Sequence, residues 1–198
     1  MQLAKIAAAA ALVAALHSSA LAQTACFAEL SAGYGIASAD LSDAWTGPIT
    51  IAADGLQAGA GLGCDVRMGR VVVGALGRYE IADIASKIGT ASFGADGQWS
   101  VAVRGGVMLS DGALAYGLVG LAGHDVSLAG AGLSETGLLV GGGLEVTAFD
   151  PRLAIFAEFT RVYGEREEIA AGVSARPVSD AVRAGVRWRF FTAGGQRE

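Results

Sequence analysis

The chain has 198 residues, with 19 acidic and 14 basic side chains, and it combines 30 glycines with only three prolines. This acidic balance argues against nucleic acid as a partner, because binding to phosphates needs a basic surface. The mean hydropathy of +0.47 is high for a secreted soluble domain, yet no segment is apolar over the roughly twenty residues that a spanning helix needs. We therefore expect the apolar residues at every second position.

The N-terminus has the features of an export signal. Lys5 precedes an apolar run from Ile6 to Leu16, and a small-residue stretch ends in Ala20-Leu21-Ala22, an A-x-A cleavage site. The apolar run of about eleven residues is too short to cross a bilayer as a helix. The sequence therefore predicts a cleaved signal peptide over residues 1–22 and a mature chain that begins at Gln23.

Period-two alternation predicts eight strands in the rest of the chain, each about ten to thirteen residues long, as a tilted membrane strand requires. The last strand shows the pattern most clearly, because apolar side chains at even positions from Val182 to Phe190 oppose Arg183, Arg187 and Arg189. In the fifth strand either face can be the outer one, because Val119 and Leu121 dilute its polar face. The predicted strands are residues 26–38, 56–67, 70–82, 99–109, 113–123, 136–148, 152–164 and 180–190.

The charged face of these strands decides the architecture. A soluble sheet turns its apolar face to a core and rarely stacks three like charges on the other face. The connections also alternate, with short turns at 68–69, 110–112 and 149–151 and long ones at 39–54, 83–96, 124–134 and 165–179. Short periplasmic turns and longer outer loops are typical of an outer-membrane barrel. We predict an all-β fold, an eight-stranded antiparallel up-and-down transmembrane β-barrel over residues 23–190, with a short C-terminal extension at 191–198.

Charged side chains on the inner face predict an ion-pair network. An eight-stranded barrel has an interior that side chains just fill, and unpaired charges there are costly. We expect the network to plug the lumen, with Arg104, Glu158 and Arg183 at one depth; a small-solute pore is the alternative. The expected lumen residues are Glu29, Arg78, Glu80, Arg104, Glu145, Glu158, Arg183 and Arg187.

Two features of the outer face are also predicted. In a hairpin of the first two strands, Cys26 and Cys64 lie opposite each other on the same face, which makes a disulfide sterically plausible in an oxidising compartment. Two unlinked thiols are the alternative. The parity of Arg161 points it at lipid, where its head near the outer rim could reach lipid phosphates.

The sequence shows no pattern that indicates catalysis or a cofactor. His124 is the single histidine of the mature chain, and Asp125 and Ser127 beside it are neighbours in sequence, whereas triad members converge from separate elements. Two cysteines and one histidine do not fill a zinc site. The glycines 141–143 lie within a strand with no helix after them, unlike a phosphate-binding loop. We expect no catalytic, cofactor-binding or metal-binding residues; a lipid-modifying enzyme and a soluble lipocalin-like carrier are less favoured alternatives.

Three blocks of sequence resemble the last three strands of the small opacity-type "porin family" outer-membrane barrels of Gram-negative bacteria. They are Gly137 to Val146, Ala157 to Val162 and Val182 to Phe190. The resemblance implies a closed eight-stranded barrel that the outer-membrane assembly machinery inserts by reading Trp188 and Phe190 of the last strand. In the family the terminal phenylalanine is usually the last residue, whereas eight residues follow Phe190 here.

The expected role is therefore structural or one of surface interaction in the cell envelope, without enzymatic activity. The expected partners are outer-membrane lipid and lipopolysaccharide, the assembly machinery during insertion, and an extracellular or host ligand bound through the loops.

Overall fold

The computed structural model describes the backbone of residues 22–43, 49–88, 91–128, 131–164, 167–170 and 173–193, and side chains within 22–38, 54–81, 97–123, 136–164 and 177–193. Within these ranges no helix has the length and apolar character needed to cross a membrane. The predicted signal peptide lies almost entirely outside the described residues, so its cleavage before Gln23 stays a prediction.

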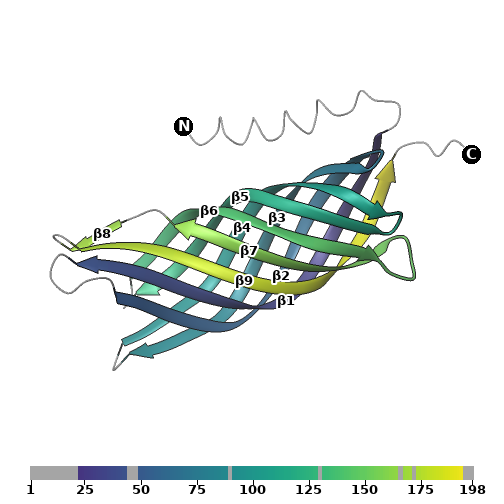
Figure 1. Ribbon diagram of the computed structural model, residues 1–198. Coiled ribbons are helices and arrows are strands. Elements are labelled where there is room, and N and C mark those ends of the chain that lie inside the picture. The colour runs from purple at the N-terminus through teal and green to yellow at the C-terminus, as the bar shows by residue number, and fades with distance from the viewer. Residues whose placement is uncertain are drawn as a thin grey trace, which may run out of the picture.

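The described chain is a single antiparallel sheet of nine strands (Figure 1). The strands are β1 (Ala22–Asp43), β2 (Ile49–Met68), β3 (Val71–Ile88), β4 (Ala91–Ser110), β5 (Ala113–Leu128), β6 (Ala131–Thr147), β7 (Leu153–Gly164), β8 (Glu167–Ala170) and β9 (Val173–Ala193). Each of β1 to β6 pairs with the next strand, β7 pairs with β9, and β9 also pairs with β1. The predicted eight-stranded closed barrel is confirmed, with the short β8 paired only to the distal end of β9.

The barrel is strongly sheared. The stagger is found by stepping from each residue to its register partner on the next strand, once round the barrel. The steps from Phe27 lead to Gly63, Leu76, Ala102, Gly120, Leu139, Val162 and Ser179. The next partner on β1 is Ala37, ten residues further along the strand than Phe27. With eight strands, this stagger corresponds to a strand tilt of about 40°. The oblique course of the ribbons in Figure 1 shows the tilt, with purple β1 beside yellow β9. Two residues joined by a register line therefore lie at different depths in the membrane.

The two faces of the sheet have the predicted orientation. Apolar side chains such as Leu30 and Leu56 are exposed on the outside, with 63% and 71% of their surface accessible. Val66 departs from this pattern, because only 5% of its surface is exposed. On β5, for which the sequence left both faces open, the buried side chains are Leu114, Tyr116, Leu118 and Ala122. An apolar outer face and a polar inner one make the barrel the inverse of a soluble β-protein.

Most strands are longer than predicted. They run to 22 residues in β1, whereas β7, with 12 residues, has about its predicted length. Most of the four long connections expected as loops are paired backbone, for example Leu41 with Ile49 and Leu128 with Ala131. The prediction was wrong because it followed hydropathy. Beyond the lipid neither face of a hairpin must be apolar, so the alternation fades while the backbone ladder continues.

The outer face carries a disulfide near the short-turn end. Cys26 pairs with Cys64 in the register of β1 and β2, and their sulfurs are bonded. At the other end Arg161 donates to both carboxylate oxygens of Asp180, at 2.6 and 2.7 Å, across the pairing of β7 with β9. Arg161 therefore has a protein partner on the face where the sequence suggested lipid phosphate.

Candidate functional site

The lumen of the barrel contains an extended set of buried ion pairs. Within the described part of the chain it joins five carboxylates and five guanidinium groups, so the fully ionised set is electrically neutral. The carboxylates are Glu29, Asp65, Glu80, Glu145 and Glu158, and the arginines are Arg78, Arg104, Arg183, Arg187 and Arg189.

Arg104 anchors the end of this network nearest the short turns. Its Nη2 lies 3.0 Å from Oδ2 of Asp65 on β2 and 3.0 Å from Oε2 of Glu145 on β6. Arg189 of β9 pairs with the other oxygen of Glu145. Only 1% of Arg104 is exposed, and a buried charge is tolerated only where partners replace its hydration.

Arg187 continues the network from Glu145 to Glu29. Its Nη1 donates to Glu145 Oε2 at 2.7 Å, and its Nε donates to Glu29 Oε2 at 2.7 Å. The other oxygen of Glu29 accepts from Nε of Arg78 at 2.6 Å. Glu29 on β1 is thus held between arginines from β9 and β3.

Glu158 joins the part of the network that lies away from the short turns. Its Oε1 accepts from Arg78 Nη1 at 2.8 Å, and its Oε2 accepts from the Tyr116 hydroxyl at 3.0 Å. Arg183 Nη1 lies 3.6 Å from Glu158 Oε1 and 3.1 Å from Glu80 Oε2, where the network ends. Every strand of the closed barrel contributes a member. In strand order, these include Glu29, Asp65, Arg78, Arg104, Tyr116, Glu145, Glu158 and Arg187.

Aromatic rings pack against two of the arginines, Arg104 and Arg187. The guanidinium carbon of Arg104 lies 4.6 Å from the centroid of the Tyr116 ring, and that of Arg187 lies 4.1 Å from the Phe156 ring. Both arginines also stack on Phe27, at 5.3 and 5.2 Å. These rings exclude water from the flat faces of the guanidinium groups, while the edges bind carboxylates.

Glycines make room for this filling. A Cβ at Gly61 would lie 3.0 Å from Cγ of Glu29, and a Cβ at Gly185 would lie 2.8 Å from the ring of Phe156 and would collide with the carbonyl oxygen of Leu30. The high glycine content thus has a local cause at these positions, because large inward side chains pack against bare backbone on the neighbouring strands.

The other side of the lumen is apolar. Buried side chains from β3 to β7 form one cluster there, and this cluster also includes Phe27 and Tyr116, which stack on the arginines. Its members on this side include Leu76, Ala102, Leu118, Ala122, Leu139 and Val162. The ion-pair network therefore packs against a hydrophobic wall, which lowers the local dielectric and strengthens the attraction within each pair.

All eight lumen residues predicted from the sequence form ion pairs, but one grouping differs. Arg104 pairs with Asp65 and Glu145, and not with Glu158 as equal counting from the turns suggested. The ten-residue stagger is the reason, because equal distance from a turn is not equal depth in a tilted barrel.

Sequence reasoning did not include Asp65, Arg189 and Tyr116 in the network. The first two already stood at inward positions of the alternation, so parity alone could have included them. Tyr116 could not be assigned, since both faces of its strand are apolar. The side chains of His124, Asp125 and Ser127 lie outside the described residues. Among the residues that the structure does describe, no group of His, Cys, Asp or Glu could hold a metal ion.

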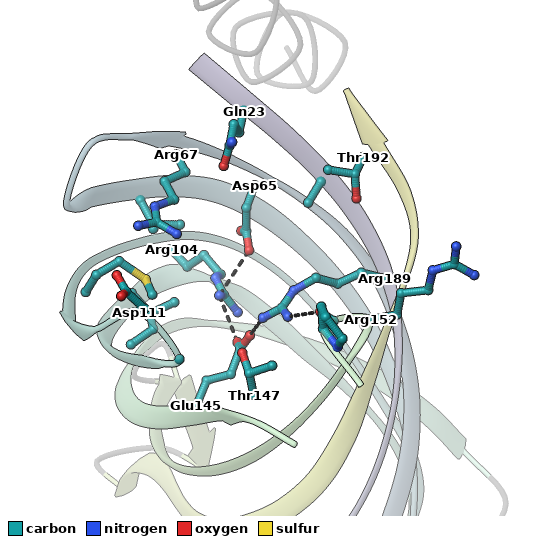
Figure 2. A pocket seen from close by; sticks show the side chains of 16 residues that line it. Gln23, Asp65, Arg67, Arg104, Asp111, Glu145, Thr147, Arg152, Arg189 and Thr192 are labelled. Atoms are coloured by element: carbon teal, nitrogen blue, oxygen red, sulfur yellow. Dashed lines mark hydrogen bonds and ion pairs between the residues drawn. The ribbon is translucent and has the colours of Figure 1, made fainter. Parts of the chain in front are cut away.

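A pocket of about 520 Å³ opens beside Arg104 at the short-turn end of the lumen (Figure 2). Charged residues and an apolar group line different parts of it. Figure 2 shows Arg104 and Arg189 directed toward Glu145, and Arg152 turned away from them. The lining includes Gln23, Ala25, Asp65, Arg67, Val72, Arg104, Met108, Asp111, Leu114, Glu145, Thr147, Arg189 and Thr192.

No family model matches the chain, and no curated protein matches it. Among solved structures, Neisserial surface protein A is similar at 18% identity and a TM-score of 0.46, over 81% of this chain and 97% of that chain. Ail, the attachment invasion locus protein of Yersinia pestis, is similar at 19% identity and a TM-score of 0.40, over 82% of this chain and 98% of that chain. The outer membrane protein OprG of Pseudomonas aeruginosa is similar at 11% identity and a TM-score of 0.44, over 84% and 97%.

The closed barrel is established by the strand pairing of this chain itself. A closed β-barrel with an apolar outside and ion pairs inside is the form in which β-strands span an outer membrane, because closure satisfies every backbone group without water. The chain is therefore an outer-membrane β-barrel.

Proposed function

We propose that this protein is a non-enzymatic outer-membrane barrel with a structural or surface-interaction role in the cell envelope. The observation that carries the proposal is the continuous ion-pair network through the lumen, from Asp65 to Glu80. A lumen filled by neutralised charges and an apolar wall leaves the barrel as a rigid membrane anchor. Its activity then belongs to the surfaces outside the membrane.

The long hairpins are the proposed contact surface. The backbone pairing of β1 with β2 reaches Leu41 and Ile49, and that of β3 with β4 reaches Ile88 and Ala91, so these hairpins continue the barrel wall beyond its apolar belt. Paired hairpins present a preorganised surface, which lowers the entropy cost of binding. We propose outer-membrane lipid and lipopolysaccharide as neighbours of the barrel and an extracellular or host ligand as the partner of the hairpins.

Insertion by the assembly machinery is part of the same proposal. The last strand carries outward-facing Trp188 and Phe190, both exposed. An aromatic-ended strand of this kind fits the assembly signal that the family resemblance implies. Because β9 continues to Ala193, the signal would lie three residues inside the strand.

The orientation of the barrel is tested by quenching with brominated lipids. A variant that keeps Trp188 as its single tryptophan is refolded into vesicles of brominated phosphatidylcholine, and a matched variant carries its single tryptophan at Phe156, which is buried in the lumen. We expect strong quenching for Trp188 and weak quenching for the Phe156→Trp variant. The reverse order would refute the outward placement of the apolar face.

A small-solute pore is the competing function, and conductance separates the two. We expect purified protein in planar bilayers to give no reproducible current steps, since side chains of Arg78, Glu158 and Arg183 meet across the lumen. A double variant, Glu158→Ala with Arg183→Ala, serves as the opened control and should show whether removing the network creates a path. Regular steps from the unmodified protein would establish the pore instead.

A further inference from the structure

The short-turn end of the lumen is electropositive although the whole network is neutral. Glu145 receives three arginines, Arg104, Arg187 and Arg189, while the other carboxylate at this end, Asp65, pairs with Arg104. Arg187 lies opposite Glu29 in the register of β1 and β9 and is paired with it, and Glu80 and Glu158 lie further from the short turns. Apart from Arg67, the lining of the pocket of Figure 2 holds three arginines, Arg104, Arg152 and Arg189, and three carboxylates, Asp65, Asp111 and Glu145.

Arg67 gives the lining an excess of one positive charge. It lines the pocket, and its Nε donates to the carbonyl oxygen of Gly69 at 2.9 Å. Within the described residues its two terminal nitrogens have no carboxylate partner. Its guanidinium group therefore offers donors to an anion that enters the pocket.

Two arginines flank one strand at the mouth of the pocket. Arg67 on β2 pairs in register with Gln23 of β1, and Arg189 on β9 pairs with Phe27. The two arginines therefore lie on either side of β1 and four residues apart along it, with the small lining residue Ala25 midway. Neighbouring strands are roughly 4.8 Å apart and a strand rises about 3.3 Å per residue, so the Cα atoms of the two arginines are about 16 Å apart. Two extended arginine side chains can span that distance, so an anionic group could contact Arg67 on one side and, on the other, the Arg189 guanidinium that also pairs with Glu145 and donates to the carbonyl oxygen of Pro151.

The opposite wall is apolar. Val72, Met108 and Leu114, from β3, β4 and β5, line the pocket away from β1, and Val72 and Leu114 are buried members of the lumen cluster. The volume of about 520 Å³ is within the range of small-molecule sites, which combine an apolar lining with a few placed polar groups. The acidic Asp111 at the rim is exposed on the β4–β5 turn.

We propose that this pocket binds a small organic anion. A carboxylate or phosphate group would be held by Arg67 and Arg189, and a short apolar body would pack against Val72, Met108 and Leu114. The ligand would enter from the side of the short turns, which is the periplasmic side of an outer-membrane barrel. This site goes beyond the proposed surface role, because it does not involve the long hairpins.

The test uses phenylphosphonate, whose charged group and ring match the two halves of the pocket. The refolded protein in lipid nanodiscs is titrated by calorimetry, and the Arg67→Gln variant is compared with Arg161→Gln, an arginine on the outer face at the other end. We expect saturable binding that weakens about tenfold in Arg67→Gln and does not change in Arg161→Gln. Equal affinity of both variants, or no saturable binding by the unmodified protein, would overturn the proposal.

A second measurement needs no variant. In protein labelled with ¹³C at the methionine methyl groups, the ring of phenylphosphonate should shift the Met108 signal and leave Met68, which is outside the pocket lining, unchanged. Inorganic phosphate should bind more weakly and leave the Met108 signal in place. A Met108 signal that does not move at saturating phenylphosphonate would exclude the apolar half of the site.

Discussion

Replacing Glu158 by glutamine should destabilise the folded barrel by about 3 kcal/mol. Glu158 is only 3% exposed, and it accepts hydrogen bonds from Arg78 and Tyr116. A glutamine keeps one acceptor oxygen, but its NH₂ group would face the donor of Arg78 or Tyr116. The substitution also leaves the lumen with one uncompensated positive charge. Breaking one member of a buried ion pair typically costs about 3 to 5 kcal/mol, and the remaining Glu29 partner of Arg78 places the expected loss at the lower end.

Urea unfolding of the protein in lipid vesicles measures this loss, with tryptophan fluorescence as the readout. For a slope of about 2 kcal/mol/M, the midpoint should fall by about 1.5 M. Asp111→Asn is the matched control, because it makes the same acid-to-amide change at an exposed turn and should shift stability by less than about 0.5 kcal/mol. The double variant Glu158→Gln with Arg78→Gln restores neutrality and should lose at least 1 kcal/mol less than the two single losses combined. A Glu158→Gln midpoint equal to that of the control would refute the network as a source of stability.

Three further outcomes follow from the barrel. Serine at both positions of the outer-face disulfide, which spans 38 residues, should lower unfolding stability by about 2 to 4 kcal/mol, and an unchanged urea midpoint would contradict this. Gly185→Ala should destabilise the folded barrel by about 1 to 3 kcal/mol, because the added methyl group would contact a buried ring. Gly105→Ala should be tolerated, because a Cβ there meets nothing within 4 Å. Equal effects of the two substitutions on urea unfolding would exclude the packing explanation. Phe190→Ala should reduce the amount of barrel assembled in cells while Phe191→Ala does not, and a heat-modifiability gel of membrane fractions would expose the opposite order.

The orientation of most side chains could be predicted because alternation has a period of two and needs no knowledge of the partner strand. Once Arg183 and Arg187 are placed inward, Val182 and Val186 must face outward, and the structure agrees. The same logic fails on β5, where Leu118 and Val119 are equally apolar. There the choice depends on the neighbouring strands, which place Leu118 against the lumen cluster.

The contacts within the lumen are a different kind of problem, because they depend on stagger. Parity states that Arg104 and Glu158 share the interior, but only the register of all eight strands gives their relative depth. A shift of the pairing by two residues would keep both inside and exchange their partners. The sequence therefore determines the membership of the network better than its connections.

The polar lumen also has a consequence for export. A strand with apolar residues on both faces would form a continuous apolar segment, and such a segment of about twenty residues is inserted into the inner membrane as a helix. In β9 the arginines 183, 187 and 189 interrupt the apolar residues at intervals of four or fewer, and each arginine near the centre of a helix opposes insertion by about 2.5 kcal/mol or more. The buried ion pairs thus reconcile two requirements. Their charges let the unfolded chain pass the inner membrane, and their mutual neutralisation lets the folded barrel contain them.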